Sequence, residues 1–409
     1  MMPPIPPSLR RARVATAVLF FVAGLTLAVW VVNIPAVEQK TGISHAVLGG
    51  LLLLLGLGSF IGMMVAGPLV DRIGSRRASL IAVLVLIVGV NLPGLADEPW
   101  QLGGALLILG LGTGSIDVAM NDQAVIVQHA FGRPIMSSFH AFFSLGGGAG
   151  ALLGAGLQAS GLSLGWSLGT GAVIAGILAA KSYPALLDTE TENKTETTAG
   201  EHTAIDTPGV RGRRSTSIVL ACLAFLMMLS EGTANDWSAL HAVDHLGQSD
   251  SAAALTYGSF AAAMTIGRFT ADFVVGRFGP VKVVRAGSLL AVMGMITVVF
   301  SPAYVLTLIG WGVFGLGLSG IVPQIFTAAG NLGGANRGVV ISRIVGAGYL
   351  GLLAGPAIIG WVSQGIGLTF ALVLPAACCV VGVILADRVA VGASTIGEDP
   401  IDVTSERAG

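Results

Sequence analysis

Long apolar runs alternate with short polar or glycine-containing turns along most of the chain. A helix that crosses a bilayer needs about 20 consecutive, mostly apolar residues, and these runs are of about that length. The pattern therefore predicts an all-α membrane protein with twelve transmembrane helices. They are expected near residues 14–36, 46–67, 78–96, 100–127, 136–160, 163–185, 216–243, 251–276, 281–300, 303–330, 337–362 and 366–388.

The apolar rhythm breaks once, over a long segment that is acidic at first and then rich in arginine, including Glu190, Glu192 and Arg211. This composition is typical of a flexible polar linker. The linker divides the predicted helices into two sets of six. The expected organisation is an N-terminal six-helix bundle over 1–185, a cytoplasmic linker over 186–215, a C-terminal six-helix bundle over 216–390 and a cytoplasmic tail over 391–409.

Lysine and arginine are concentrated in both tails and in every second turn between the predicted helices. The other turns carry only Lys40. Positive residues are retained in the cytoplasmic loops of membrane proteins. We therefore expect a multi-pass protein of the plasma membrane, with both termini in the cytoplasm and the lipid bilayer as its surroundings.

The composition agrees with this class and excludes others. Charged residues make up 11% of the 409 residues and hydrophobic residues 54%, whereas soluble proteins average about 25% charged residues. A net charge of −1 provides no basic surface for nucleic acid. The three cysteines, at positions 222, 378 and 379, lie in apolar runs without metal-ligand spacing, so neither a disulfide framework nor a zinc site is suggested. No metal or other cofactor is expected, since no nucleotide-binding motif or metal-ligand cluster is present in the sequence.

A charged, glycine-containing segment follows the second apolar run. It reads Gly-Pro-Leu-Val-Asp-Arg-Ile-Gly-Ser-Arg-Arg over residues 67–77 and is expected to form a tight turn. Residues 267–279 repeat it in part, because Arg277-Phe278-Gly279 matches Arg72-Ile73-Gly74. Asp272, however, lies about one helical turn farther from its arginine than Asp71 does. The second copy is therefore interpreted as degenerate.

These features together resemble the major facilitator superfamily. Residues 117–121 and 138–150 are similar to the fucose-permease-like branch, whose members are proton-coupled sugar symporters with a carboxylate on the fourth helix, here Asp117, and an asparagine one turn later, here Asn121. That branch also carries an aspartate on the first helix, where this chain has Trp30 and Asn33. The resemblance implies two helical bundles that rock about a central solute site.

Two acidic residues inside apolar runs are the main candidates for that site. A charge at the bilayer centre costs at least about 2.5–3.5 kcal/mol on insertion scales, so Asp117 and Glu231 each need a reason to be there. Each is followed four residues later by an asparagine, Asn121 or Asn235. A carboxylate removed from water is able to load and release protons near neutral pH. We predict that these four residues bind protons and the solute, the alternative being hydrogen bonds that only join helices.

Other polar residues in the helices receive narrower predictions. The set Trp30, Asn33, His140, Trp237, His241 and Gln324 is a candidate for cavity lining, with helix packing as the alternative, and His140 is also a candidate proton relay for Asp117. Arg268 and Asp272 are expected to pair within one helix, and Asp122 and His129 are expected to pair locally.

The charged segments are predicted to form a cytoplasmic gate, in which Asp71 meets Arg343 or the start of the helix near 337–362 and so latches the two halves together. The residues assigned to this gate are Gly67, Asp71, Arg72, Gly74, Arg76, Arg77, Arg268, Asp272, Arg277 and Arg343.

The absence of nucleotide-binding motifs and of a paired nucleophile and base argues against an enzyme. The sequence favours a monomeric secondary transporter that moves a small polar solute, sugar-like or another metabolite, in symport with protons. A proton-driven efflux antiporter for amphiphilic compounds is the first alternative and predicts a wide apolar cavity. A membrane signalling or scaffold protein that transports nothing is the second.

Overall fold

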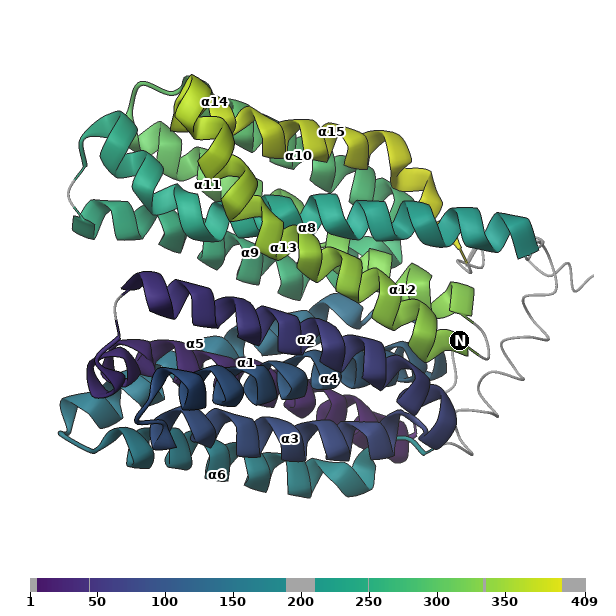
Figure 1. The fold of residues 1–409 in the computed structure, drawn as a ribbon. Helices are drawn as coiled ribbons and strands as arrows, with labels where there is room; N and C mark the ends of the chain where they lie inside the picture. The colour runs from purple at the N-terminus through teal and green to yellow at the C-terminus, as the bar shows by residue number, and fades with distance from the viewer. Residues whose placement is uncertain (1–5, 44, 189–209, 249, 334–335, 392–409) are drawn as a thin grey trace, which may run out of the picture.

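The computed structural model describes residues 6–43, 45–188, 210–248, 250–333 and 336–391. Most of the predicted linker and of the predicted tail therefore lies outside the described residues. The described chain forms two helical bundles, residues 6–188 in the lower half of Figure 1 and residues 210–391 in the upper half. Eleven spans of the described residues are long and apolar enough to cross a membrane.

Six helices form the N-terminal half. They are α1 (Pro7–Thr41), α2 (His45–Ile73), α3 (Ser75–Leu95), α4 (Pro99–Phe131), α5 (Met136–Ala159) and α6 (Leu164–Ser182), with a short 3-10 helix η1 (Tyr183–Ala185) after them. These helices match the predicted ones in number and order. Several extend beyond their apolar runs, because a helix continues into the polar surroundings until a residue such as Gly42 or Gly132 adopts a left-handed conformation.

The C-terminal half repeats this plan with two broken helices. It contains α8 (Val210–Leu246), α9 (Asp250–Phe278), α10 (Pro280–Phe300), α11 (Tyr304–Leu318), α12 (Ile321–Gly333), α13 (Arg337–Ile366), α14 (Leu368–Ala371), α15 (Val373–Leu385) and the 3-10 helix η3 (Ala386–Ala390). The predicted helices near 303–330 and 366–388 are each split. Both breaks come shortly before a proline, Pro323 or Pro375, which lacks an N–H and clashes with the preceding turn.

Glycines bring helix backbones into direct contact inside each half. A methyl group on Gly146 or Gly150 of α5 would clash with a carbonyl oxygen of α1, and one on Gly351 or Gly355 of α13 would meet a carbonyl oxygen of α8. The two pairs of helices occupy equivalent places in the two halves. Glycine at these positions therefore permits the close helix packing that is common in membrane proteins.

This packing supplies a stability prediction with a matched control. Gly146→Ala is expected to lower the unfolding temperature in detergent, because overpacking a helix contact costs about 1–3 kcal/mol and the new methyl group would clash with the carbonyl oxygen of Phe21. Gly147→Ala should leave stability unchanged or slightly higher, since among the described residues no atom outside the backbone of its own helical turns lies within 4 Å of the added methyl group. Equal unfolding temperatures for the two variants would contradict the packing.

The two halves meet through α2 against α13 and through α5 against α9. We call the end of the molecule that holds Gly74, Gly132 and Gly279 the linker end, because the residues on both sides of the segment 189–209 lie there (Figure 1). The predicted turn over 67–77 is shorter in the structure. Residues 67–73 belong to α2, and Gly74 alone, at φ 80°, turns the chain into α3.

Candidate functional site

A cavity of about 500 Å³ lies between the two halves. Helices α1, α2, α4 and α5 contribute to its wall from one side, and α8, α9, α12 and α13 from the other. Most of the lining is apolar, and its polar side chains are Ser59, Thr113, Asp117, His140, Glu231, Asn235, Arg268 and Tyr349. Three of the four residues predicted for the site, Asp117, Glu231 and Asn235, therefore line one cavity.

Asp117 of α4 reaches the cavity wall with little hydrogen bonding. Its side chain is 6% exposed. The Asn121 amide donates to the Asp117 carbonyl at 2.8 Å and to its Oδ1 at 3.3 Å. Asp117 Oδ2 and Asn121 Oδ1 are buried and have no hydrogen-bond partner within the part of the chain that the structure describes. Asn121 therefore orients the carboxylate from behind, while one oxygen of Asp117 still lacks a donor.

Glu231 of α8 is held by an arginine from the neighbouring helix. Arg268 Nη2 of α9 donates to Glu231 Oε1 at 3.0 Å, and its Nη1 donates to Ser144 Oγ of α5 at 2.9 Å. Arg268 thus joins the acidic residue of its own half to a helix of the other half. The predicted ion pair between Arg268 and Asp272 is wrong, because each of them points from α9 to a different partner outside its own helix.

Asp272 binds the start of α5. Its carboxylate accepts from the backbone N–H of Ser137 at 2.8 Å and of Ser138 at 2.7 Å. The first N–H groups of a helix have no partner within the helix and carry partial positive charge, so a carboxylate is well placed there. We call this contact the Asp272 latch.

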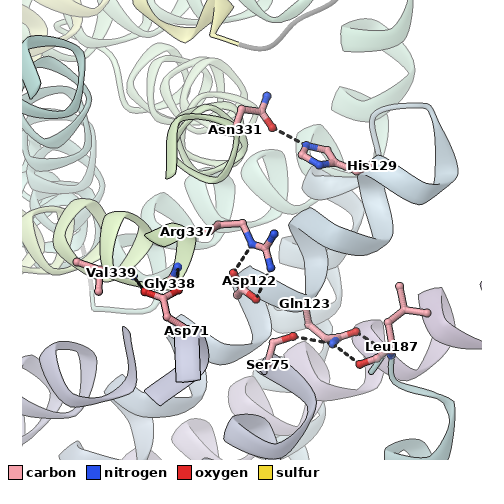
Figure 2. A network of polar contacts seen from close by, with 10 residues as sticks. All are labelled: Asp71, Ser75, Asp122, Gln123, His129, Leu187, Asn331, Arg337, Gly338 and Val339. Carbon is pink, nitrogen blue, oxygen red and sulfur yellow. Dashed lines mark hydrogen bonds and ion pairs between the residues drawn. The ribbon is translucent and has the colours of Figure 1, made fainter. Parts of the chain in front are cut away.

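Asp71 makes the equivalent contact with the start of α13 (Figure 2). Its carboxylate accepts from the N–H of Gly338 at 2.7 Å and of Val339 at 3.1 Å. Of the two partners predicted for Asp71, the structure shows the start of this helix, whereas Arg343 is exposed. We call this contact the Asp71 latch.

The two latches lie in matching segments of the internal repeat, but the positions of the aspartate and a glycine are exchanged between the two copies. Gly67 lies at the position of α2 that matches Asp272 on α9, and it packs closely on Ser342. Gly276 matches Asp71, and a methyl group added to it would lie 3.9 Å from Pro134. The second copy is therefore not degenerate, as the sequence had suggested. Glycine and aspartate have exchanged places over one helical turn, and both copies bind the start of a helix in the opposite half.

A buried ion pair lies beside the Asp71 latch. Arg337 Nε of α13 donates to Asp122 Oδ1 of α4 at 2.6 Å, and the two side chains are 10% and 0% exposed. His129 of α4 contacts the Asn331 amide oxygen of α12 (Figure 2). The predicted local pairing of Asp122 with His129 is wrong, since the face of α4 that carries both is covered by the C-terminal half.

The arginines assigned to the gate differ in their contacts and exposure. Arg76 lies over the Tyr183 ring at 4.7 Å and 4.0 Å from Asp188, so it anchors the chain that leads into the linker. Nearby, Gln123 donates to Ser75 Oγ and to the Leu187 carbonyl (Figure 2). Four further arginines assigned to the gate are exposed, namely Arg72, Arg77, Arg277 and Arg343, whereas Arg268 pairs with Glu231.

The predicted cavity-lining residues are mostly elsewhere. His140 lines the cavity, with its ring 5.1 Å from that of Phe20 and 5.8 Å from that of Phe326. The others are not part of the lining and are buried or half-buried; for example, Asn33 of α1 donates to Ser167 Oγ of α6 at 2.9 Å, and the His241 ring of α8 lies 6.4 Å from the Trp311 ring of α11. These residues are Trp30, Asn33, Trp237, His241 and Gln324.

Sequence reasoning missed two kinds of functional residue. The pairing of Arg268 with Glu231 could have been predicted from the sequence, since an arginine inside an apolar helix requires a buried acid as its partner. Arg337 had no comparable signal, because it begins a helix and resembles an ordinary loop arginine. Within the described residues, no group of three or more His, Cys, Asp or Glu side chains is placed to hold a metal ion.

Comparison with known proteins gives consistent matches. The family model described as Major Facilitator Superfamily matches residues 16–234 and 220–394. An uncharacterized MFS-type transporter of Yersinia pestis is 37% identical over 352 residues, which are 86% of this chain and 89% of that protein. The membrane protein MosC of Rhizobium meliloti is 30% identical over 375 residues, 91% of this chain and 88% of that protein.

Among solved structures, the chain is similar to FucP, a fucose:proton symporter of E. coli, in its outward conformation. The TM-score is 0.72 at 18% identity, over 92% of this chain and 98% of that one. At this identity the likeness concerns the fold alone.

Proposed function

Since the chain belongs to the major facilitator superfamily, we propose that its central cavity binds a small polar solute and carries it across the membrane by alternating access, coupled to protons. Membership of this family makes the chain a secondary transporter and not an enzyme. The observation that carries the proposal is the buried carboxylate of Asp117, which lines the cavity with one oxygen unpartnered.

The sidedness of the protein follows from its positive residues. Arginines of the charged segment, Arg72, Arg76 and Arg77, lie at the linker end, and positive residues are retained on the cytoplasmic side. We assign the linker end and both termini to the cytoplasm of a plasma-membrane protein that works as a monomer. The two moving units are the bundles over 1–185 and 216–390.

With this assignment, the two latches and the Asp122–Arg337 pair close the cytoplasmic end. Exposed lining residues such as Leu53 and Leu353 lie on α2 and α13 on the other side of the latches. The arrangement corresponds to an outward-facing state. Opening the cytoplasmic end requires that both latches and the buried ion pair separate, while the cavity closes on the outer side.

Protons enter this cycle at the two acidic residues. Protonation of Asp117 removes the charge of a carboxylate that has only one weak donor, and this lowers the cost of occluding it from water. Protonation of Glu231 would release Arg268, which also binds Ser144 in the other half. For a neutral solute, such as a sugar, loading these sites together with the solute gives symport, the mode that the fucose-permease-like residues favour.

Solute-driven proton movement in proteoliposomes tests the proposal. Monosaccharides, amines and organic acids are added outside, and the internal pH is followed with a trapped dye. One solute class is expected to drive proton movement in the unsubstituted protein, and Asp117→Asn and Glu231→Gln should each reduce it at least about tenfold. Unchanged movement in both variants would rule out coupling through these carboxylates.

The latches give a second test, which concerns motion and not binding. Asp71→Asn or Asp272→Asn removes a charged acceptor at a helix start, an interaction worth about 0.5–2 kcal/mol. Each variant is expected to open the cytoplasmic end more often while solute affinity changes little. Distances between spin labels on the two halves and binding titrations measure the two quantities, with Asp236→Asn, an exposed residue, as the control. A large loss of affinity with unchanged distances would make the aspartate a binding residue.

A second candidate is proton-driven exchange of an amphiphilic compound. The largely apolar lining, with Phe60, Phe143, Phe326 and several leucines, favours it. In proteoliposomes this mode moves protons against the solute, so the sign of the internal pH change separates it from symport.

A further inference from the structure

We propose that the solute of the central cavity carries a protonated amine on a compact apolar body, and that Asp117 is the counterion of this amine. The inference rests on one part of the proposed function, the cavity as the solute site, and of the two transport modes it selects the exchange of an amphiphilic compound for protons. It goes further by assigning a chemical class and an orientation to the solute.

The charged side chains that line the cavity are not fully paired. Two carboxylates, Asp117 and Glu231, and one guanidinium, Arg268, face the cavity. The guanidinium is matched to Glu231 at 3.0 Å. Among the described residues, no cation lies within ion-pairing distance of Asp117, and its Oδ2 has no hydrogen-bond partner. The carboxylate therefore needs a cation or a proton, and an organic anion bound beside it would be repelled.

The wall of the cavity is largely apolar and aromatic. Aromatic rings of Phe60, Phe143, Phe326 and Tyr349 and the thioethers of Met120 and Met228 surround the cavity. Such a wall accepts an apolar body and attracts a cation through the ring faces. A ligand with many hydroxyl groups would leave several of them without partners, which is costly in a site removed from water. A single amine requires only one strong acceptor.

The size of the cavity agrees with a compact ligand. A volume of about 500 Å³ lies within the range of small-molecule sites, about 300–1,000 Å³. In this arrangement the amine is directed to α4 of the N-terminal half, and the apolar body lies against α12 and α13 of the C-terminal half. Because a bound amine and a proton on Asp117 exclude each other, the solute would be exchanged for protons.

Three molecules with one phenylethyl body test the class. The unfolding temperature of the purified protein is measured with 2-phenylethylamine, 2-phenylethanol or 3-phenylpropanoate. The amine is expected to raise it by about 2 °C or more at saturation, the alcohol by less, and the carboxylate not at all. In Asp117→Asn the effect of the amine should disappear, while Asp236→Asn, which removes an exposed carboxylate outside the lining, should respond like the unsubstituted protein.

Other outcomes overturn the inference. They are an equal or larger shift with 3-phenylpropanoate, an amine effect that persists in Asp117→Asn, or no shift with any of the three molecules. If Asp117→Asn does not fold, Asp117→Glu replaces it and should keep the preference of amine over carboxylate. Failure here leaves solute-driven proton movement as a separate result, so the solute class and the transport function are judged independently.

Discussion

Asp122→Asn is expected to open the linker end of the protein. In the closed end, Arg337 is 10% exposed and pairs with a fully buried Asp122. Removal of one partner leaves a buried charge uncompensated, at a cost of about 3–5 kcal/mol. Separation of the halves exposes Arg337 to water and relieves this cost. The variant should therefore shift the equilibrium toward the open end by about 100-fold or more.

Distances between spin labels report this shift directly. Labels at Arg77→Cys and Lys282→Cys, both exposed positions on different halves, are measured in a Cys222→Ser background. Asp97→Asn is the matched control, since it breaks an ion pair with Lys40 that is exposed and lies within one half. Exposed pairs contribute about 0–1 kcal/mol. Replacing both partners, Asp122→Leu with Arg337→Met, should recover part of the closed population. An unchanged distance distribution in Asp122→Asn would show that the pair does not hold the gate.

Arg268→Leu is expected to reduce solute-driven proton movement at least about 100-fold. The ion pair that it breaks lies in the wall of the cavity, and breaking such a pair costs about 3–5 kcal/mol. The substitution leaves Glu231 without its partner and Ser144 without its donor. Asp117 faces the same cavity, so two carboxylates then share one site without a cation.

The companion variants separate charge from geometry. Arg268→Lys keeps the charge but not the two-ended geometry of the guanidinium, and only partial activity is expected. Arg285→Leu, which removes an exposed arginine paired with Asp387, should move protons normally. Addition of Glu231→Gln to Arg268→Leu should restore thermal stability without restoring proton movement. Full activity of Arg268→Leu would contradict a role for the bridge between the halves.

Much of the fold was predictable because the membrane imposes local rules. Each crossing requires an apolar run of fixed length with all backbone groups bonded internally, so the helices and the six-plus-six division are visible in the sequence. The breaks near Ser319 and Leu372 were missed, although Pro323 and Pro375 were visible. Apolar length alone does not distinguish a continuous helix from two short ones in line.

Of the residues in the candidate site, the acidic ones were the most readily predicted from the sequence. Asp117 and Glu231 stand out because a charge is costly in an apolar helix. Spacing along one helix was also used to pair the other charged residues, and that rule gave Arg268 with Asp272 and Asp122 with His129. In the structure Arg268 binds Glu231, and Asp122 binds Arg337 in the other half.

The sequence by itself determined the membrane class, the two halves, the repeated charged segment and the acids that need an explanation, because each is a local consequence of helix length and of the cost of burying charge. Only the tertiary structure decided the partners. The contacts of Asp71 with α13 and of Asp272 with α5 join segments far apart in the chain. Such contacts depend on how the two bundles face each other, which no spacing within one helix encodes.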